Sequence, residues 1–339
     1  MFDPNLQGHL PVRQRLLERV QAERLSGSVV LVGPNGIGKR RVALELAQRE
    51  LCFRRTACGD CAGCKPFKTD PLPQELPNLL RIAPEGKAGV IKIGAIREDD
   101  LVEGGVIRWA HQASMPGTHR WILVEDAHRL NGSSANMLLK ILEEPPPSTH
   151  FLLVTHRPEA MLQTIRSRCE RISLQALEPA DVWKIAASAG WAASDRESWV
   201  ALAGGTLRYL DPAAFALAVA QVDAWLAIAA GESFAAAAGP LLPDKNSPLA
   251  QSEQVTQVLE LLQRILADTA RLREGHTLGL APWRAGIETL ARSPFELKGP
   301  VEAIHHALRH LTRNPFAESL LREIAMALKV RPGSPSKKP

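Results

Sequence analysis

The chain has 339 residues, of which 45% are hydrophobic and 23% are charged, and its formal net charge is +5 at pH 7. This composition excludes a disordered or fibrous protein, and the length is typical of two or three globular domains. No apolar run reaches the roughly 20 residues of a membrane span, and the first residues lack the apolar core of a signal peptide. We therefore expect a cytoplasmic protein, whose small basic excess is compatible with nucleic acid nearby but does not indicate it.

The first chemical motif follows a helix predicted within residues 10–26 and a strand predicted at 28–32. Gly33, Gly38 and Lys39 have the spacing of a Walker A loop, in which backbone N–H groups and a lysine hold phosphates at the start of a helix. The next position departs from that pattern, because Arg40 replaces the Ser or Thr whose hydroxyl binds Mg²⁺. A degenerate nucleotide-binding loop and an ordinary strand-to-helix turn both fit this stretch.

The segment after the next predicted helix holds four of the five cysteines, Cys52, Cys58, Cys61 and Cys64. A reducing compartment disfavours disulfides, and four thiolates so close in sequence suit the tetrahedral coordination of Zn²⁺, with bonds of about 2.3 Å. We predict a structural zinc site, because four protein ligands leave no open position for a substrate. A redox-active thiol cluster is the alternative interpretation.

A second motif of a nucleotide site is the apolar strand predicted at residues 119–126, which ends in Glu125 and Asp126. Two carboxylates at a strand end are typical of a Walker B motif, where an aspartate holds hydrated Mg²⁺ and the following glutamate orients the attacking water. Here the order is reversed, which changes the length of the side chain at each position by one methylene. The carboxylates that hold Mg²⁺ and orient the water are thereby displaced, and catalysis is sensitive to such displacements. Surface charges at a strand end are the alternative interpretation.

Apolar periodicity and helix-end signals predict the remaining elements. They are a short strand at 79–83, helical turns between 93 and 110, a helix at 132–144 with Asn131 as its N-cap, and strands at 151–155 and 171–174. From residue 177 onward we expect only helices, with a break at 203–208, a loop at 231–251 and two long amphipathic helices, one from 255 to 272 and one around 301–311. Residues 331–339 are expected to form a disordered tail.

The most specific stretch is residues 136–169, which carries LLKILEEPP and ends in the triplet Ser167, Arg168 and Cys169. These motifs resemble the clamp-loader branch of the AAA+ ATPases, and within it the bacterial delta-prime family. The resemblance covers nearly the whole chain, including the cysteine module, residues 80–98 and residues 314–328. The pattern alone would not single out Arg168, so its candidate role comes from the resemblance.

The resemblance implies a RecA-like AAA+ α/β P-loop domain over residues 1–174, with the cysteine module inserted at about 52–64. It further implies a small helical lid domain over 175–218 and an all-α collar domain over 219–330. Such a chain would be one member of a hetero-pentameric ring with gamma/tau and delta subunits. In that family the ring opens the sliding clamp and closes it around primed DNA.

Site residues are implied in the same way. Arg168, between Ser167 and Cys169, would reach the ATP of a neighbouring motor subunit as an arginine finger, since a guanidinium stabilises charge on a transferring phosphoryl group. Thr155 matches the sensor 1 position, and Arg208 matches the sensor 2 arginine. The family also supports Zn²⁺ at the cysteine module.

The departures from the family's motor subunits decide the expected activity. ATP could still be held by Gly33, Gly38, Lys39 and Arg208. However, Arg40 and the Glu125-Asp126 order remove the groups that bind magnesium and orient the attacking water. We therefore expect a component of the replicative DNA polymerase holoenzyme with weak or no ATP hydrolysis, which is not itself a polymerase. The alternative is an active clamp-loader motor of gamma/tau type. A helicase-like or DNA-repair AAA+ protein that uses zinc for DNA contact is disfavoured by the LEEPP stretch and the Ser167-Arg168-Cys169 triplet. The sequence also lacks a basic patch interleaved with aromatic residues, which argues against direct base reading.

Overall fold

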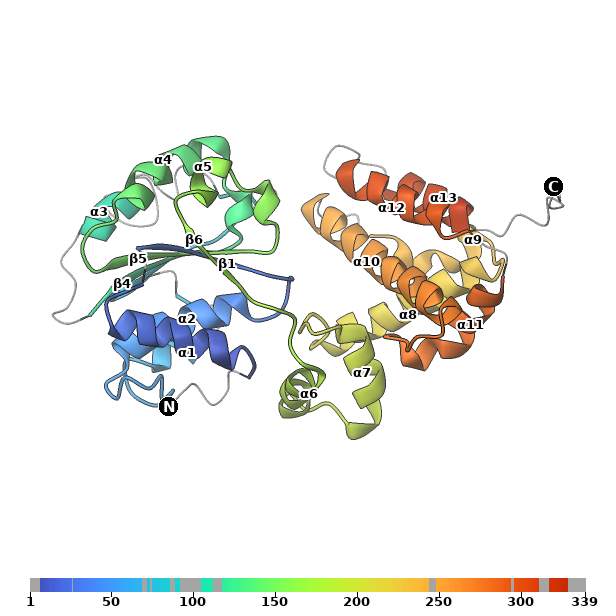
Figure 1. Ribbon diagram of the computed structural model, residues 1–339, viewed down its shortest axis with the longest axis horizontal. Helices are drawn as coiled ribbons and strands as arrows, with labels where there is room; N and C mark the ends of the chain where they lie inside the picture. The colour runs from blue at the N-terminus through green and yellow to red at the C-terminus, as the bar shows by residue number, and fades with distance from the viewer. Residues whose placement is uncertain are drawn as a thin grey trace. The chain divides into compact units, whose positions relative to one another are not determined.

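The computed structural model describes residues 7–25, 27–68, 72–73, 75–85, 89–91, 105–111, 118–243, 248–293, 296–310 and 317–328. The chain forms two compact units. The first comprises Met1–Ile185 with Gly205–Leu207, and the second comprises Ala186–Gly204 with Arg208–Pro339. Figure 1 labels the elements of both units.

A six-stranded sheet with the order β2-β3-β4-β5-β1-β6 forms the centre of the first unit. β2 pairs antiparallel with β3, and all other neighbouring strands are parallel. The strands are β1 (Ser28–Val32), β2 (Glu75–Leu76), β3 (Leu79–Ile82), β4 (Arg120–Val124), β5 (Thr149–Thr155) and β6 (Glu170–Ser173). Because neighbouring parallel strands end at the same edge, the residues that follow β4, β5 and β1 are brought together there.

Helices cover both faces of this sheet (Figure 1). On β1, Val30 and Val32 join the core shared with α3, α4 and α5, whereas Val29 and Leu31 join the core shared with α1 and α2. Burial on both faces explains why the central strands are apolar without alternation. The helices are α1 (Leu10–Gln21), α2 (Lys39–Leu51), α3 (Gly105–His111), α4 (Gly132–Glu143) and α5 (Gln163–Arg166), with short 3₁₀ turns η1 (Lys65–Lys68), η3 (Ala127–Arg129) and η4 (Pro158–Ala160).

The predicted capping of α4 is confirmed. The side chain of Asn131 accepts a hydrogen bond of 2.8 Å from the backbone N–H of Ser134, which satisfies one of the free donors at the start of the helix. Leu138 and Ile141 lie on one face of α4 and pack in the core against the sheet. The proline run from Pro145 cannot continue the helix, so α4 ends before it.

The second unit is helical. It contains the end of α6 (Pro179–Ser188), α7 (Arg196–Ala203), α8 (Pro212–Ala229), α9 (Phe234–Ala237), α10 (Pro248–Arg273), α11 (Arg284–Arg292), α12 (Lys298–His310) and α13 (Ala317–Leu328), with 3₁₀ turns η5 (Ala193–Asp195), η6 (Gly239–Leu241) and η7 (Ala281–Trp283). Its core includes Tyr209, Trp225, Leu259 and Ile304. α8 is long and apolar enough to cross a membrane by length and composition alone, but its Trp225 is fully buried in this core.

The expected mixed α/β sheet followed by a helical region is confirmed, with small shifts at element ends. The loop expected at 231–251 was wrong in part, because α9 and η6 lie within it and α10 already begins at Pro248. Ser233 starts α9 by accepting a hydrogen bond from the N–H of Ala236, a local capping signal that the Ala-rich and Gly-rich composition obscured.

The lid domain expected over residues 175–218 does not end between two helices. The boundary expected between lid and collar at residue 218 falls inside α8, and the division into those two domains stays a prediction. The helical turns expected between 93 and 104 lie outside the described residues, as does the tail at 331–339.

Candidate functional site

The glycine-rich loop connects β1 to α2, as predicted. Gly33 is required where it stands, since a Cβ there would lie 2.3 Å from the backbone carbonyl oxygen of Leu174, and Gly38 has a φ of 92° at the N-cap of α2. Lys39 is only 5% exposed. Its Nζ donates hydrogen bonds to the backbone oxygens of Gly33 at 3.0 Å and of Pro34 at 2.5 Å. The ammonium group therefore lies against carbonyl groups of its own loop.

Two contacts from elsewhere in the first unit hold the middle of the loop. His9 Nε2 lies 2.7 Å from the backbone oxygen of Ile37, whose side chain is buried. The backbone N–H of Leu207 donates a 2.8 Å hydrogen bond to the carbonyl oxygen of Gly36. Burial lowers the pKa of His9 below its ordinary value, so the imidazole is neutral at pH 7.

Arg40 and Glu125 form an ion pair, which joins the two motifs predicted from the sequence. Arg40 Nε lies 2.9 Å from Glu125 Oε1. Arg81 on β3 contacts the same oxygen through both Nε and Nη2, each at 2.8 Å. Glu125 is 14% exposed, so this carboxylate is largely enclosed by two guanidinium groups. A carboxylate held in this way is poorly available to a magnesium ion, because two fixed cations already neutralise it.

Asp126 contacts a different set of side chains. Its backbone is left-handed, with φ 47°, and its Oδ1 lies 3.6 Å from His156 Nδ1. His128 Nδ1 lies 3.1 Å from Thr155 Oγ1, and the rings of His128 and His156 meet edge to face at 4.5 Å between centroids. Burial lowers the pKa of His128 to about 4. The two carboxylates of the predicted Walker B pair thus have separate partners.

Thr155 occupies the end of β5, beside Val32 at the end of β1. It is fully buried, and its Oγ1 accepts a 3.0 Å hydrogen bond from the backbone N–H of Arg157. The predicted sensor 1 residue therefore lies on the strand next to the one that leads into the glycine-rich loop. Arg208 belongs to the second unit, where it pairs with Glu260, and its sensor 2 role stays a prediction.

The triplet of Ser167, Arg168 and Cys169 follows α5. Arg168 forms an ion pair with Glu143 at the end of α4, and its Nη1 donates a 3.1 Å hydrogen bond to the backbone oxygen of Thr164. Its side chain is 34% exposed. Ser167 donates to Thr164 O at 3.0 Å, and Cys169 is buried in the core, where burial raises the pKa of its thiol to about 12. Ser167 and Cys169 thus fix the backbone on either side of Arg168, whose side chain is partly exposed.

The four cysteines lie together directly after α2. Cys52 Sγ lies 3.7 Å from Cys58 Sγ and 4.0 Å from Cys61 Sγ, and the four ligand atoms, including that of Cys64, lie within 4.8 Å of one another. A tetrahedron of sulfur atoms around Zn²⁺, with bonds of about 2.3 Å, has edges of about 3.8 Å. The donor set therefore fits a structural zinc ion.

Local backbone geometry supports the same cluster. A Cβ on Gly63 would lie 1.8 Å from the backbone oxygen of Leu51, so only glycine allows the cysteine turn to pack against the end of α2. The N–H of Cys64 donates a 2.9 Å hydrogen bond to Cys61 O. Burial alone would raise the pKa of Cys52, but hydrogen bonds from nearby backbone N–H groups outweigh it and lower that pKa to about 5.

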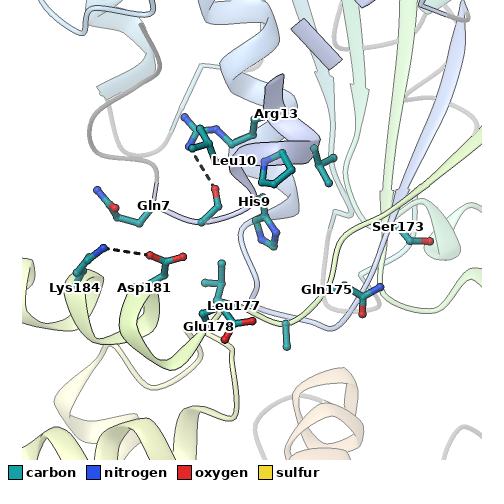
Figure 2. Close-up of a pocket in the computed structure, with 14 residues that line it drawn as sticks. Gln7, His9, Leu10, Arg13, Ser173, Gln175, Leu177, Glu178, Asp181 and Lys184 are labelled. Carbon is teal, nitrogen blue, oxygen red and sulfur yellow. Dashed lines mark hydrogen bonds and ion pairs between the residues drawn. The ribbon is translucent and has the colours of Figure 1, made fainter. Parts of the chain in front are cut away.

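A pocket of about 660 Å³ lies between the segment that leads into α1 and the segment that joins β6 to α6 (Figure 2). His9 lines this pocket and also contacts the glycine-rich loop through Ile37. Arg13 lines it as well and forms a buried bidentate pair with Glu45, at 2.7 and 2.8 Å. His9 therefore contacts both the pocket and the glycine-rich loop.

Residues 8–178, about half of the chain, match the family model described as DNA polymerase III, delta subunit. The chain belongs to this family. The delta-prime subunit of DNA polymerase III from Pseudomonas aeruginosa is 35% identical over 179 residues, which are 52% of this chain and 52% of that relative. The tau/gamma subunit from Haemophilus influenzae is 30% identical over 172 residues, which are 49% of this chain and 23% of that relative.

The chain thus spans about half the length of its delta-prime relative, and the resemblance to the delta-prime family is confirmed. A solved structure, the gamma-subunit-related protein of Thermotoga maritima, covers 93% of this chain and 98% of its own, with 18% identity and a TM-score of 0.44. That likeness is too distant to support an argument about function.

Four residues of the site were missed from the sequence: His9, Arg81, His128 and His156. Arg81 could have been found, because a charged residue inside an apolar strand needs a partner. His128 and His156 each follow a predicted buried strand closely, which is the position where parallel sheets gather functional groups. Each of the four has a partner at least 27 positions away in the chain, which no local pattern reveals.

Proposed function

We propose that this chain is a delta-prime-like subunit of the bacterial clamp loader of the DNA polymerase III holoenzyme, with an AAA+ first unit. It acts in a hetero-pentameric ring beside gamma/tau and delta subunits, in the cytoplasm. The ring loads the sliding clamp onto primed DNA, and the chain contributes neither a polymerase nor a nucleotidyltransferase site. Membership of the DNA polymerase III delta-subunit family supports this assignment.

The single observation that carries the non-hydrolysing role is the contact of Arg40 and Arg81 with one oxygen of Glu125. Hydrolysis of ATP needs Mg²⁺ near the β- and γ-phosphates, held by a hydroxyl and a carboxylate. In this chain a guanidinium stands at the hydroxyl position, and the carboxylate is engaged with two arginines. We expect ATP hydrolysis at this loop to be weak or absent for that reason.

Arg168 is the residue that we propose to act in a neighbour's site. It is partly exposed, it follows a short helix whose turn is tied by Ser167, and its guanidinium has a carboxylate partner, Glu143, that can be exchanged for a phosphate. An arginine finger of this kind contributes about 10³ to 10⁵ in rate to phosphoryl transfer. Cys169 holds the base of this segment in the core.

Two ligands complete the proposal. Cys52, Cys58, Cys61 and Cys64 would hold a structural Zn²⁺, which would link the excursion after α2 into one rigid module. ATP, if retained without turnover, would place its phosphates on Gly38 and Lys39 and its base in the pocket lined by His9. The passive site would then serve the architecture of the ring rather than catalysis.

The test is the DNA-stimulated ATPase activity of a ring reconstituted with gamma/tau and delta subunits. We expect Arg168→Ala, and also Arg168→Lys, to reduce turnover severely, because lysine keeps the charge but lacks the planar fork. Lys39→Ala should leave turnover unchanged. Arg166→Ala, which removes an exposed arginine two positions away, is the matched control.

The opposite pattern would support the second candidate function, an active motor of gamma/tau type. The observation in its favour is that Lys39 and both loop glycines are retained. If Lys39→Ala abolishes turnover while Arg168→Ala has no effect, the Arg40-containing loop is a working ATPase and the non-hydrolysing role is wrong.

A further inference from the structure

Three metal-ligating side chains meet at the edge of the sheet where β4 and β5 end. Asp126 and His128 follow β4, in and before the 3₁₀ turn η3, and His156 is the first residue after β5. The two strands are parallel neighbours in register, with Val124 opposite Leu153, so their carboxyl ends lie side by side. The sheet therefore brings together residues about 30 positions apart, and the proposed clamp-loader role uses neither histidine.

The separations within this group suit a single ion. One ligand atom from each of Asp126, His128 and His156 lies within 4.8 Å of the others, and the Asp126 Oδ1 to His156 Nδ1 distance is 3.6 Å. Ligands of a tetrahedral Zn²⁺, with bonds of about 2.0 to 2.1 Å, are separated by about 3.3 Å. Small side-chain rotations would close the remaining gap.

The surroundings orient the group in the way that metal sites require. His128 Nδ1 is within hydrogen-bond distance of Thr155 Oγ1, at 3.1 Å, and a partner at one ring nitrogen is the usual device that orients a metal-bound histidine. Asp126 holds a left-handed backbone conformation, with φ 47°, a region that aspartate can occupy as a single residue. The Asp126 side chain is 42% exposed and that of His156 22%, so an ion can enter from solvent.

Two nearby cations have partners of their own. Arg129 Nη1 donates a 3.2 Å hydrogen bond to the backbone oxygen of Gly89, and Arg157 Nε lies 3.9 Å from Glu159 Oε1. Each guanidinium thus has a partner outside the group, and Arg129 also acts electrostatically on Asp126 and His128. A carboxylate with two imidazoles selects a borderline cation such as Zn²⁺ over Mg²⁺, which prefers oxygen ligands.

We propose that Asp126, His128 and His156 form a second metal site, which binds Zn²⁺ or a similar borderline divalent cation independently of the four cysteines. Three protein ligands leave a fourth position for water or for an anionic group of a binding partner. Bound metal ties the end of β4 to the end of β5, next to Thr155. In its absence the same residues form a histidine–aspartate pair with a second ring packed against it.

The test is metal stoichiometry of the full chain, measured by elemental analysis after dialysis with Zn²⁺ and by titration with Co²⁺. We expect two equivalents per wild-type chain, one with the intense thiolate-to-cobalt absorption of the cysteine cluster and one with only the weak bands of nitrogen and oxygen ligands. His156→Ala should bind one equivalent and retain the thiolate absorption. His276→Ala removes an exposed histidine elsewhere and should retain two.

A second variant distinguishes loss of a metal ligand from a folding defect. Asp126→Asn preserves the shape of the side chain but removes its charge, so it should lower the affinity of the second equivalent at least about tenfold while the thermal unfolding temperature of the metal-free chain is unchanged. The proposal is overturned if the wild-type chain binds no equivalent beyond the one that gives the thiolate-to-cobalt absorption. It is equally overturned if His156→Ala keeps both equivalents, or if Asp126→Asn binds the second as tightly as the wild-type chain does.

Discussion

Arg40 Nε and Glu125 Oε1 are 2.9 Å apart, so the residue that breaks the phosphate-loop pattern is paired directly with the carboxylate that ends β4. The guanidinium stands where the missing hydroxyl would help to hold a magnesium ion, and it contacts a group that would be that ion's other protein ligand. Two departures that are separate in the sequence are thus one interaction in the folded chain.

Replacing Arg40 by threonine should restore magnesium dependence to nucleotide binding. The change removes one of the two guanidinium groups from Glu125 and supplies a hydroxyl ligand. We expect the variant to bind a fluorescent ATP analogue at least about tenfold more tightly with Mg²⁺ than with EDTA, a difference of about 1.4 kcal/mol. The wild-type chain should show no such difference. Arg41→Thr, at the exposed neighbouring position, is the control, and equal affinities for Arg40→Thr in both buffers would contradict the argument.

Replacing Glu143 by glutamine should release Arg168 without a large effect on stability. Both side chains of this pair are partly exposed, and such pairs contribute at most about 1 kcal/mol. In a reconstituted ring we expect a higher rate of ATP turnover, because the guanidinium no longer has to leave a carboxylate before it reaches a phosphate. Glu144→Gln changes the exposed neighbour and should leave the rate unaltered. A lower rate for Glu143→Gln would show that Glu143 positions the finger.

Replacing Gly63 by alanine should disrupt the cysteine cluster. The added Cβ would lie 1.8 Å from Leu51 O, a backbone atom that cannot move without shifting the end of α2. We expect a free energy of unfolding lower by about 1 to 3 kcal/mol, as for other overpacked positions, and less zinc per chain by elemental analysis. Gly132→Ala, where nothing lies within 4 Å of the new atom, should change neither quantity by much. Full zinc content and unchanged stability in Gly63→Ala would contradict the packing argument.

His9 should make stability fall as the solution becomes acidic. Burial lowers its pKa in the folded chain, and Arg13 and Lys39 act in the same direction, against raising effects of the Ile37 carbonyl and of Asp181. Between the lowered pKa and the ordinary value of 6.5 the unfolded chain therefore binds more protons, so the free energy of unfolding decreases as pH falls through this window.

Two measurements check this dependence on pH. An NMR titration should place the midpoint of His9 below 6.5, and urea unfolding should show a smaller loss of stability between pH 7 and pH 5 in His9→Asn than in the wild-type chain. His276→Asn, at an exposed histidine, should retain the full dependence. A His9 midpoint above 6.5 would contradict the assignment.

Much of the fold could be predicted because its signals are local. Asn131 caps α4 through a residue three positions away, the apolar run at 28–32 forms a strand because both of its faces are buried, and the cysteines are near neighbours in the chain. The segment at 231–251 was read wrongly in part, since a short helix such as α9 has too few residues to show a periodic pattern.

The amino-acid sequence by itself determined the strand-loop-helix at Gly33 to Lys39, the four-cysteine donor set and membership of the DNA polymerase III delta-subunit family. Only the tertiary structure decided that Arg40 pairs with Glu125, that Arg168 rests on Glu143 and that His128 meets His156. These contacts join residues far apart in the chain, and they depend on which strands are neighbours in the sheet. Strand order results from the packing of the whole core, and no local sequence pattern encodes it.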